Sequence, residues 1–388
     1  MKESLLITLS GPERPGITSA FLKDLSRCQV QVLDLGLSTV HGQIFLSILL
    51  DPQNGQVIEV LKDEASKHGL TWSGVPLKVA ARQLPKVHRY VLSCASPLLI
   101  TTQYLAAVTG LLCDHGIKID RIDSKSDATL KALDLICSSA VDVNLMRIKT
   151  GLMDLSNVHK IDAAFMEDDL FRYNKKLIVF DMDSTLIQGE VIDELAKAHG
   201  IGDQVRAITV RAMNGELGFD QALHQRVALL KGFPRSKMDE IHHKLKLSPG
   251  AEKLIQTVRK LGFKTAIVSG GFHYFAEPLR KQLGIDYLFA NDLDWDGDVL
   301  SGKVKGPVVN AEQKAVILET LAQKENIYLQ QVVAIGDGAN DLPMLAKAGL
   351  GIAFHAKEKV KNEARHQLSH GPMSTILYFL GIPGDHFA

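Results

Sequence analysis

The spacing of apolar residues between positions 1 and 80 changes repeatedly between that of strands and that of helices. Short apolar runs and alternating positions predict strands, whereas Ile17, Phe21 and Leu25 recur every four residues and predict an amphipathic helix. The expected elements run strand, helix, strand, strand, helix, strand over residues 5–9, 17–25, 33–37, 44–50, 57–61 and 70–79. This βαββαβ order is the ferredoxin-like plan of an α+β module.

A similar order of elements recurs about 85 residues further along the chain, as expected for an internal repeat. The corresponding elements of this second copy are expected over residues 90–92, 105–112, 117–119, 132–137, 145–155 and 158–165. The copies differ in their first loop. The first contains the Pro- and Gly-rich stretch 10–16, whereas the second has Ala95-Ser96-Pro97-Leu98-Leu99 there, without a glycine.

The pattern changes after an acidic stretch at 167–169, which is typical of a linker. From Lys175 onward, short apolar runs alternate with helical stretches. The runs 177–180, 265–268 and 332–335 have no polar alternation, which indicates strands buried on both faces of a parallel sheet. This second style of sequence predicts an α/β domain.

Polar residues follow each of these three buried runs. The sequences are Asp181-Met182-Asp183-Ser184-Thr185, Ser269-Gly270-Gly271 and Gly336-Asp337-Gly338-Ala339-Asn340-Asp341. A further helix that begins near Asn310 carries Lys314. Because ligands of open α/β sheets bind at the carboxyl ends of the strands, we expect these side chains to form one site.

Four aspartates at one sheet edge would repel one another. At about 4 Å, each pair of like charges costs about 4 kcal/mol at an effective dielectric constant near 20. Such a cluster must protonate in part or bind cations, and carboxylate oxygens without nearby Cys or His favour Mg²⁺ over zinc. A cation, Lys314, a serine hydroxyl and the amides of glycines are the groups that hold a phosphate dianion.

Asp181 and Asp183 are separated by one residue, which predicts a division of labour. At a strand end, positions i and i+2 point the same way. One carboxylate can then attack phosphorus, while the other protonates the leaving oxygen and afterwards activates water.

Composition limits the classes of function. Lys plus Arg and Asp plus Glu both number 44, so no basic excess points to a nucleic-acid partner. No apolar run is long enough to span a membrane, and the apolar stretch 5–9 is too short for a signal peptide. The four cysteines lack CxxC spacing and are expected to be reduced core residues of a cytoplasmic protein; zinc or disulfide pairing is the weaker alternative.

The four strand-end and helix motifs, in this order and spacing, resemble those of the haloacid dehalogenase superfamily of phosphatases. The resemblance covers about residues 175–382 and implies a Rossmann-like parallel-sheet core with a helical cap at about 190–248. The expected domains are 1–83 and 84–168, each a ferredoxin-like α+β module, a linker at 169–174, and the phosphatase domain at 175–388.

Within that superfamily, the chain most resembles the phosphoserine phosphatase family. Glu190 stands nine residues after Asp181, as that family's acidic residue does, and the stretch Ala212 to Phe219, followed by Arg226, is similar to its cap. The resemblance implies that Glu190 pairs with the substrate ammonium and that Arg226 holds its carboxylate. Met213 and Phe219 would form an apolar lid that excludes water.

The resemblance also implies roles for the core residues. Asp181 is the expected nucleophile and Asp183 the acid and base, while Asp181, Asp337 and the Asp183 carbonyl hold Mg²⁺. Asp341 is expected to orient Lys314. The expected phosphate ligands are Ser269, Gly270, Gly271, Lys314 and Asn340.

The two N-terminal modules resemble ACT domains, which are small regulatory units that bind amino acids. The loop with Gly11, Glu13 and Gly16 matches the glycine-bearing loop of that family, which makes it a candidate effector site for serine or another amino acid. Because ACT modules usually pair across chains, the resemblance implies a homodimer. The second module lacks the glycine loop.

The resemblance thus favours Mg²⁺-dependent hydrolysis of O-phospho-L-serine to L-serine and phosphate through an aspartyl-phosphate, the last step of serine biosynthesis. Two alternatives compete with it. A related phosphatase or phosphotransferase would act on another small phosphorylated metabolite, for which Glu190 and Arg226 together would not be needed. A catalytically inert amino-acid sensor would not need the complete set of Asp181, Asp183, Lys314 and Asp337.

Overall fold

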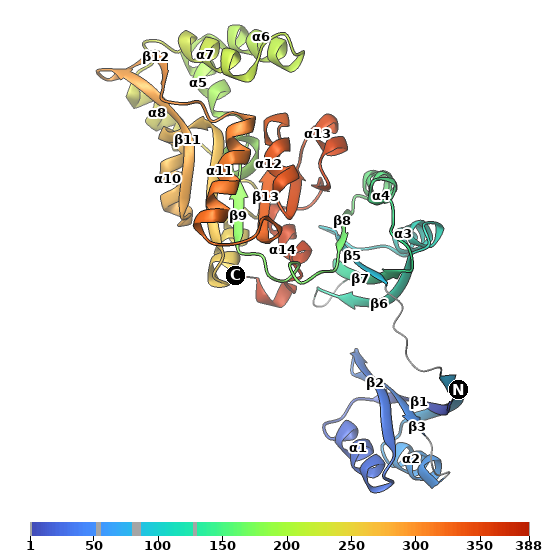
Figure 1. Cartoon of the computed structure of the whole chain (residues 1–388). Helices are drawn as coiled ribbons and strands as arrows, with labels where there is room; N and C mark the ends of the chain where they lie inside the picture. The colour runs from blue at the N-terminus through green and yellow to red at the C-terminus, as the bar shows by residue number, and fades with distance from the viewer. Residues whose placement is uncertain (1, 52–55, 80–86, 127–129, 388) are drawn as a thin grey trace. The chain divides into compact units, whose positions relative to one another are not determined.

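The computed structural model describes residues 2–51, 56–79, 87–126 and 130–387 (Figure 1). Contacts divide the chain into two compact units, Met1–Lys86 and Val87–Ala388. The limit expected at 83–84 lies outside the described residues. The other domain limits remain predictions.

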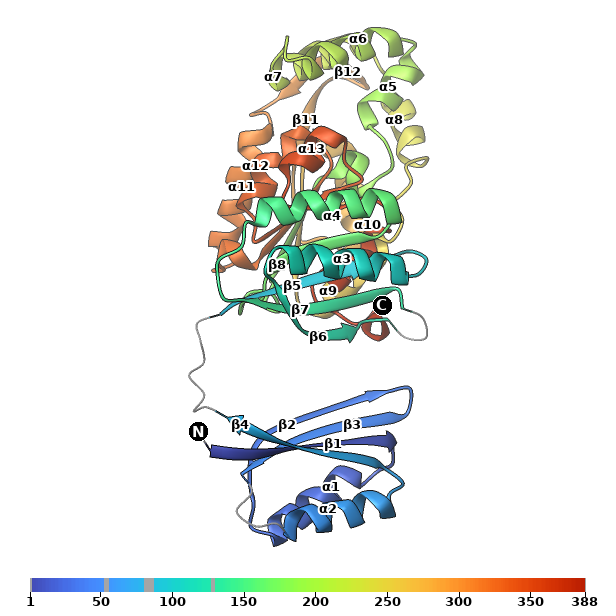
Figure 2. The ribbon, with the colours of Figure 1, turned by 90° about the vertical axis from the view of Figure 1, so that its right-hand side faces the viewer.

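The first unit has the expected βαββαβ order, and we call it the first module. Its four strands form an antiparallel sheet in the order β2-β3-β1-β4, with both helices on one face (Figure 2). Ile17, Phe21 and Leu25 are buried against that face, which explains their four-residue spacing. Its elements are β1 (Lys2–Pro12), α1 (Ile17–Arg27), β2 (Gln31–Val40), β3 (Gln43–Asp51), α2 (Gln56–Lys67) and β4 (Thr71–Val79).

The expected loop at 10–16 is shorter than the sequence suggested. Strand β1 continues to Pro12, where Gly11 pairs with Ile44 and Pro12 with Gln43. Proline is tolerated there because the pairing of β1 with β4 ends at Ser10, so β1 has an open edge at Pro12. The loop is therefore confined to residues 13–16.

The second module repeats the order and the sheet topology of the first, now as β6-β7-β5-β8. One expected boundary was wrong. Helix α4 continues to His159 and ends with Lys160 in the left-handed conformation, so the last strand begins at Asp162 rather than at residue 158. The elements are β5 (His88–Ala95), α3 (Thr102–Asp114), β6 (Lys118–Ser124), β7 (Ala132–Ser139), α4 (Leu145–His159) and β8 (Asp162–Glu167).

The rest of the second unit, called the α/β part, is built on a seven-stranded sheet in the order β12-β11-β10-β9-β13-β14-β15. The strands are parallel except for the edge strand β12, which pairs antiparallel with β11. The three runs expected as buried parallel strands are β9, β10 and β13. The strands are β9 (Leu177–Phe180), β10 (Lys264–Phe272), β11 (Tyr287–Asp296), β12 (Val299–Lys305), β13 (Val332–Gly336), β14 (Leu350–Phe354) and β15 (His366–Leu368).

Helices cover both faces of this sheet, which explains why its central strands are apolar throughout. Ile178 and Phe180 pack in one core cluster, while Leu177 and Val179 belong to another on the opposite face. The covering elements include α9 (Ala251–Lys260), α10 (His273–Leu283), α11 (Ala311–Lys324), α12 (Leu342–Lys347), α13 (Glu358–Glu363) and α14 (Ile376–Phe379).

A group of helices between β9 and α9 forms a cap. Figure 1 shows these helices beyond the carboxyl end of β9, to which its arrow points. The cap helices are α5 (Val191–His199), α6 (Gly202–Met213), α7 (Phe219–Leu229) and α8 (Arg235–His242). They place the cap over the sheet edge at which the sequence predicts the site.

Two buried charges tie the second module to the chain that follows it. The carboxylate of Asp162, at the start of β8, accepts backbone N–H bonds from Ser369, His370 and Gly371 at 2.6–3.2 Å. Arg172, which was expected to lie in a linker, is buried and donates to Asp134 at 2.6 Å. Residues 169–174 are thus partly packed rather than free.

The cysteine expectation holds in part. Cys94 and Cys137 are buried and Cys28 is half-buried, but Cys113 is exposed on α3, so it is not a core residue. All four are free thiols. Among the described residues, no helix combines the length and the apolar character needed to cross a membrane.

Candidate active site

The first site segment leaves the carboxyl end of β9. The Asp181 amide donates to the carbonyl of Ile335 on the neighbouring strand β13 at 2.9 Å, which fixes the start of this segment. The chain then makes one tight turn over Met182–Leu186, with Ser184 at a φ of 54°. This turn brings Thr185 back toward β13, where its hydroxyl donates to Asp337 at 2.9 Å.

The second segment follows β13. The Asp341 carboxylate accepts N–H bonds from Asp337 at 3.1 Å and from Gly338 at 2.9 Å, so it closes the loop that begins at Gly336. A β-carbon on Gly336 would overlap the Asp341 side chain. Glycine is therefore needed at that position for the carboxylate to reach the loop amides.

Lys314 joins these two segments. Its helix α11 starts after Asn310, as expected from the sequence, and the Asn310 side chain caps the Gln313 amide. The Lys314 ammonium is fully buried and lies 2.9 Å from the Asp181 carboxylate and 2.7 Å from that of Asp341. Burial opposes its charge, but the two carboxylates outweigh this effect and raise its pKa, so Lys314 stays protonated.

The carboxylates of Asp181, Asp337 and Asp341 offer oxygen atoms within 4.8 Å of one another. Burial and the charges of Asp181 and Asp341 raise the pKa of Asp337 to about 8. Burial and Asp181 likewise raise the pKa of Asp341 to about 6, although Lys314 partly offsets this effect. One lysine therefore leaves the cluster short of positive charge, and its hard oxygen donors fit a divalent cation such as Mg²⁺.

Asp183 lies apart from this cluster, against the motif Ser269-Gly270-Gly271. Its carboxylate accepts the Val191 amide at the start of the cap at 2.9 Å, and a β-carbon on Gly271 would overlap it. Burial, followed by the charge of Glu190, raises the pKa of Asp183 well above its ordinary value. Asp183 is therefore suited to carry a proton.

The motif Ser269-Gly270-Gly271 occupies the end of β10. Ser269 is buried, and its hydroxyl accepts the Gly271 amide at 2.9 Å. Asn291 on β11, which the sequence analysis missed, donates to the Gly270 carbonyl and accepts the Val309 amide, both at 2.8 Å. Its sequence signal was a polar residue directly after the apolar run 287–290.

The cap residues divide into two groups. The Phe219 ring lies against Gly270, since a β-carbon there would be 2.8 Å from the ring. Near that glycine, Asp220 accepts a bond from Asn310 at 3.2 Å, so α7 touches the core. Met213, by contrast, is 61% exposed at the end of α6.

Glu190 and Arg226 influence each other electrostatically, and Asp181 acts on Glu190 while Asp183 acts on Arg226. Glu190 accepts the Ser184 hydroxyl at 2.9 Å, and burial together with Asp181 and Asp193 raises its pKa. Arg226 is half-buried and donates to the Ala222 carbonyl at 3.3 Å. Its pKa is lowered by burial, while the charges of Glu190, Asp193 and Asp183 act in the opposite direction.

The remaining predicted residues are placed as follows. Asn340 is half-buried on the short helical turn after β13, beside Gly338. In the first module, Gly11 approaches Leu70 so closely that a β-carbon would be 2.7 Å from it, which is a packing reason for the glycine. Glu13 is exposed, and Gly16 begins α1 with a φ of 96°.

Comparisons with known proteins agree with this architecture. The haloacid dehalogenase-like hydrolase family matches residues 175–349, and an ACT domain family matches residues 3–73. The chain is 37% identical to phosphoserine phosphatase SerB2 of Mycobacterium tuberculosis over 98% of this chain and 94% of that protein.

Two solved structures are also similar. A probable phosphoserine phosphatase from Vibrio cholerae shares 34% identity with a TM-score of 0.59, over 76% of this chain and 87% of that one. A structure described as a phospho-aspartyl intermediate analogue of phosphoserine phosphatase shares 42% identity with a TM-score of 0.51, over 53% of this chain and 99% of that one.

Proposed function

Because the chain belongs to the phosphoserine phosphatase family of haloacid dehalogenase-like phosphatases, we propose that it hydrolyses O-phospho-L-serine to L-serine and inorganic phosphate. The observation that carries this proposal is the convergence of Asp181, Lys314 and Asp337 at one sheet edge. Two residues of opposite charge that act on each other, Glu190 and Arg226, accompany this cluster.

Asp181 is the proposed nucleophile. A carboxylate oxygen of Asp181 forms a bond to phosphorus while the bond from phosphorus to the serine oxygen breaks, which leaves an aspartyl-phosphate. Lys314, 2.9 Å from this carboxylate, holds it in place and balances charge that moves onto the phosphoryl oxygens. The related structure of a phospho-aspartyl intermediate analogue supports this route.

Asp183 is the proposed acid and base. Its raised pKa keeps a proton on it, which passes to the departing serine oxygen. The resulting carboxylate then takes a proton from water as that water attacks phosphorus. The bond between phosphorus and Asp181 breaks, and phosphate and the free Asp181 carboxylate are regenerated.

The loop groups around these aspartates bind the phosphoryl oxygens in this proposal. Ser269, Gly270 and Gly271 offer a hydroxyl and amides at the end of β10, and Asn340 offers an amide group from the second segment, after β13. Mg²⁺ would be held by Asp181, Asp337 and the Asp183 carbonyl, and its charge would stabilise the pentacoordinate phosphoryl group. Asp341 orients Lys314 at 2.7 Å.

Glu190 and Arg226 select the substrate in this proposal. Glu190 pairs with the ammonium of phosphoserine, and Arg226 holds its carboxylate. Phe219 covers Gly270, and Met213, 61% exposed, would join it as an apolar lid.

A phosphate-release assay tests the proposal. We expect turnover of O-phospho-L-serine in Mg²⁺ to exceed that of other phosphomonoesters and to disappear in EDTA. Asp181→Asn should abolish turnover, because the amide is a far weaker nucleophile, while the far-UV spectrum stays unchanged. The exposed control Asp298→Asn should keep full activity. Turnover retained by Asp181→Asn would contradict the covalent route, and a faster reaction with another ester would contradict the substrate.

The same proposal includes regulation and cellular role. The match of residues 3–73 to an ACT domain supports binding of an amino acid such as serine at the loop with Gly11, Glu13 and Gly16, and pairing of chains through these modules. We place the enzyme in the cytoplasm, at the last step of serine biosynthesis.

A further inference from the structure

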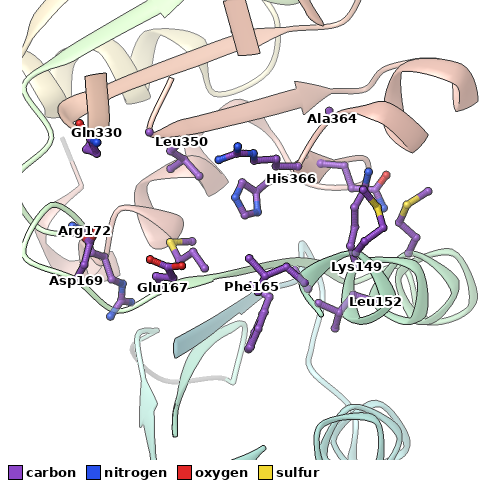
Figure 3. Close-up of a pocket in the computed structure, with 18 of the residues that line it drawn as sticks. Lys149, Leu152, Phe165, Glu167, Asp169, Arg172, Gln330, Leu350, Ala364 and His366 are labelled. Carbon is purple, nitrogen blue, oxygen red and sulfur yellow. Dashed lines mark hydrogen bonds between the residues drawn. The ribbon is translucent and has the colours of Figure 1, made fainter. Parts of the chain in front are cut away.

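A cavity of about 610 Å³ lies between the second module and the α/β part, outside the site described above. Helix α4 and strand β8 line it from one side, and β14, β15 and the end of α13 line it from the other (Figure 3). Cavities of this size hold small organic ligands.

This cavity is remote from the proposed reaction centre. Gln330 precedes β13 and Gly349 precedes β14, so the cavity reaches the amino ends of these parallel strands. The aspartate and lysine cluster, by contrast, lies at their carboxyl ends. A ligand here would not compete with a phosphoryl group for the same atoms.

Much of the wall is apolar. Leu152 and Phe165 lie on the second module, Leu350 lies on β14, and the flexible side chains of Met146 and Met153 complete this surface. In Figure 3, Phe165 lies below the ring of His366, and Leu152 lies on α4. Such a wall suits an apolar ligand body.

Two lysines supply incompletely paired positive charge. The Lys149 ammonium donates to the Asn362 carbonyl, and the Lys175 ammonium to the Gln330 carbonyl, both at 2.6 Å. Within the described part of the chain, no carboxylate lies within ion-pair distance of either lysine. Burial lowers the pKa of both, and each ammonium keeps donors for another partner.

His366 adds a third polar group to the cavity. Burial, together with the charges of Arg365, Lys149 and Lys175, lowers its pKa to about 4, so the ring is neutral near pH 7. Figure 3 shows this ring in the middle of the cavity. The neutral ring can donate one hydrogen bond to an acceptor on a ligand.

The acidic side chains of the lining act on the two lysines, but they are exposed, so solvent screens their charge. Asp169 accepts the backbone amides of Phe171 and Arg172 at 2.8 and 3.0 Å, so it is already engaged. Glu167 and Glu363 are exposed at the rim. The buried and half-buried charges of the lining are therefore cationic, which favours an anionic ligand.

We propose that this cavity binds a small organic carboxylate with an apolar body, whose charged group lies at His366, between Lys149 and Lys175, and whose body lies against Phe165 and Leu350. The site joins both halves of the second unit, and its ligand differs in class from a phosphorylated substrate.

Calorimetry on the full chain with linear carboxylates tests this site. Octanoate should bind saturably, once per chain. Affinity should rise about fourfold per added CH₂ from butyrate to octanoate, since about 0.8 kcal/mol per CH₂ converts at 1.4 kcal/mol per tenfold. The neutral analogue 1-octanol should bind at least tenfold more weakly.

Variants locate the binding. Lys149→Met and Lys175→Met keep an unbranched side chain without the charge, and each should weaken octanoate at least tenfold. Arg147→Met, on the exposed face of α4, the helix that carries Lys149, should change the affinity for octanoate less than twofold. Thermal unfolding of each variant checks that it is folded. The test is decided by either lysine variant, provided that this variant is folded. No saturable heat, equal affinity in the lysine and Arg147 variants, or equally tight 1-octanol would each overturn the proposal.

Discussion

At the scale of single residues, the site depends on glycines that let charged side chains approach the backbone. Gly271 leaves room for the Asp183 carboxylate, and Gly336 leaves room for that of Asp341. These carboxylates in turn accept the amides of Val191, Asp337 and Gly338. The motif with Gly271 and the motif with Asp183 thus pack against each other, although they are far apart in the sequence.

Gly271→Ala should therefore displace Asp183. The new methyl group would occupy the position of the carboxylate and lie 2.8 Å from Met182. Since a displacement of about 1 Å can cost about 100-fold in rate, we expect kcat/KM for phosphoserine to fall by about that factor. The matched control Gly202→Ala meets no atom within 4 Å and should keep its activity. Equal activities of the two variants would show that Asp183 does not depend on this glycine.

Arg226→Ala tests the proposed role of Arg226 in binding the carboxylate of the substrate. Loss of a charged hydrogen bond to the substrate carboxylate should lower kcat/KM for phosphoserine by about 10- to 100-fold, the equivalent of about 1.5–3 kcal/mol. Hydrolysis of an aryl phosphate, which lacks that carboxylate, should change less than threefold. Arg206→Ala, an exposed cap variant, serves as the control. A similar loss on both substrates would contradict carboxylate recognition.

At the scale of elements, the loops that follow parallel strands bring the candidate site residues together. A buried carboxylate, that of Asp162, joins the second module to the α/β part. Strands β9, β10 and β13 are adjacent, so their carboxyl ends meet at one edge. Strand β8 belongs to another sheet, but its first residue, Asp162, binds the loop that follows β15. The second module is therefore docked on the α/β part by a specific polar contact.

Asp162→Ala should weaken this docking. Removal of a fully buried carboxylate leaves the amides of Ser369, His370 and Gly371 without their acceptor, at a cost of roughly 2–4 kcal/mol. Denaturant unfolding measures this loss, and amide exchange at 369–371 should become faster. Asp154→Ala, exposed on α4, should leave both quantities unchanged. Unchanged exchange in Asp162→Ala would indicate that other contacts hold the loop.

At the scale of the whole molecule, the edge strand β2 of the first module stays uncovered among the described residues of that unit. Every residue of β2 is exposed, including Leu33, Leu35 and Leu37, and Phe45 on β3 is exposed as well. Exposed apolar residues in such number are typical of an association surface. This is consistent with the proposed pairing of chains through the ACT modules.

Calorimetry with L-serine on the full chain tests the proposed regulation. We expect saturable binding, and Glu13→Ala, in the exposed loop, should weaken it at least fivefold without changing basal turnover. Glu59→Ala, exposed on α2 of the same module, is the matched control. Titrations without heat for serine and other amino acids would leave the modules without an effector role.

The sequence by itself determined the repeat, the buried parallel strands and the order of the candidate catalytic motifs, because these follow from local periodicity and from residues next to strand ends. It also indicated that Asp181, Lys314 and Asp337 converge, since parallel strands end at one edge. Local signals failed where packing decides, as at the exposed Cys113 and the extension of β1 to Pro12.

Only the tertiary structure decided the contacts between distant segments. Arg172, expected in a linker, is buried against Asp134, and Asn291 ties β11 to the loop before α11. The cavity with Lys149 and His366 likewise arises from segments more than 200 residues apart. Such contacts depend on how separately folded faces meet, and no periodicity within either segment encodes that arrangement.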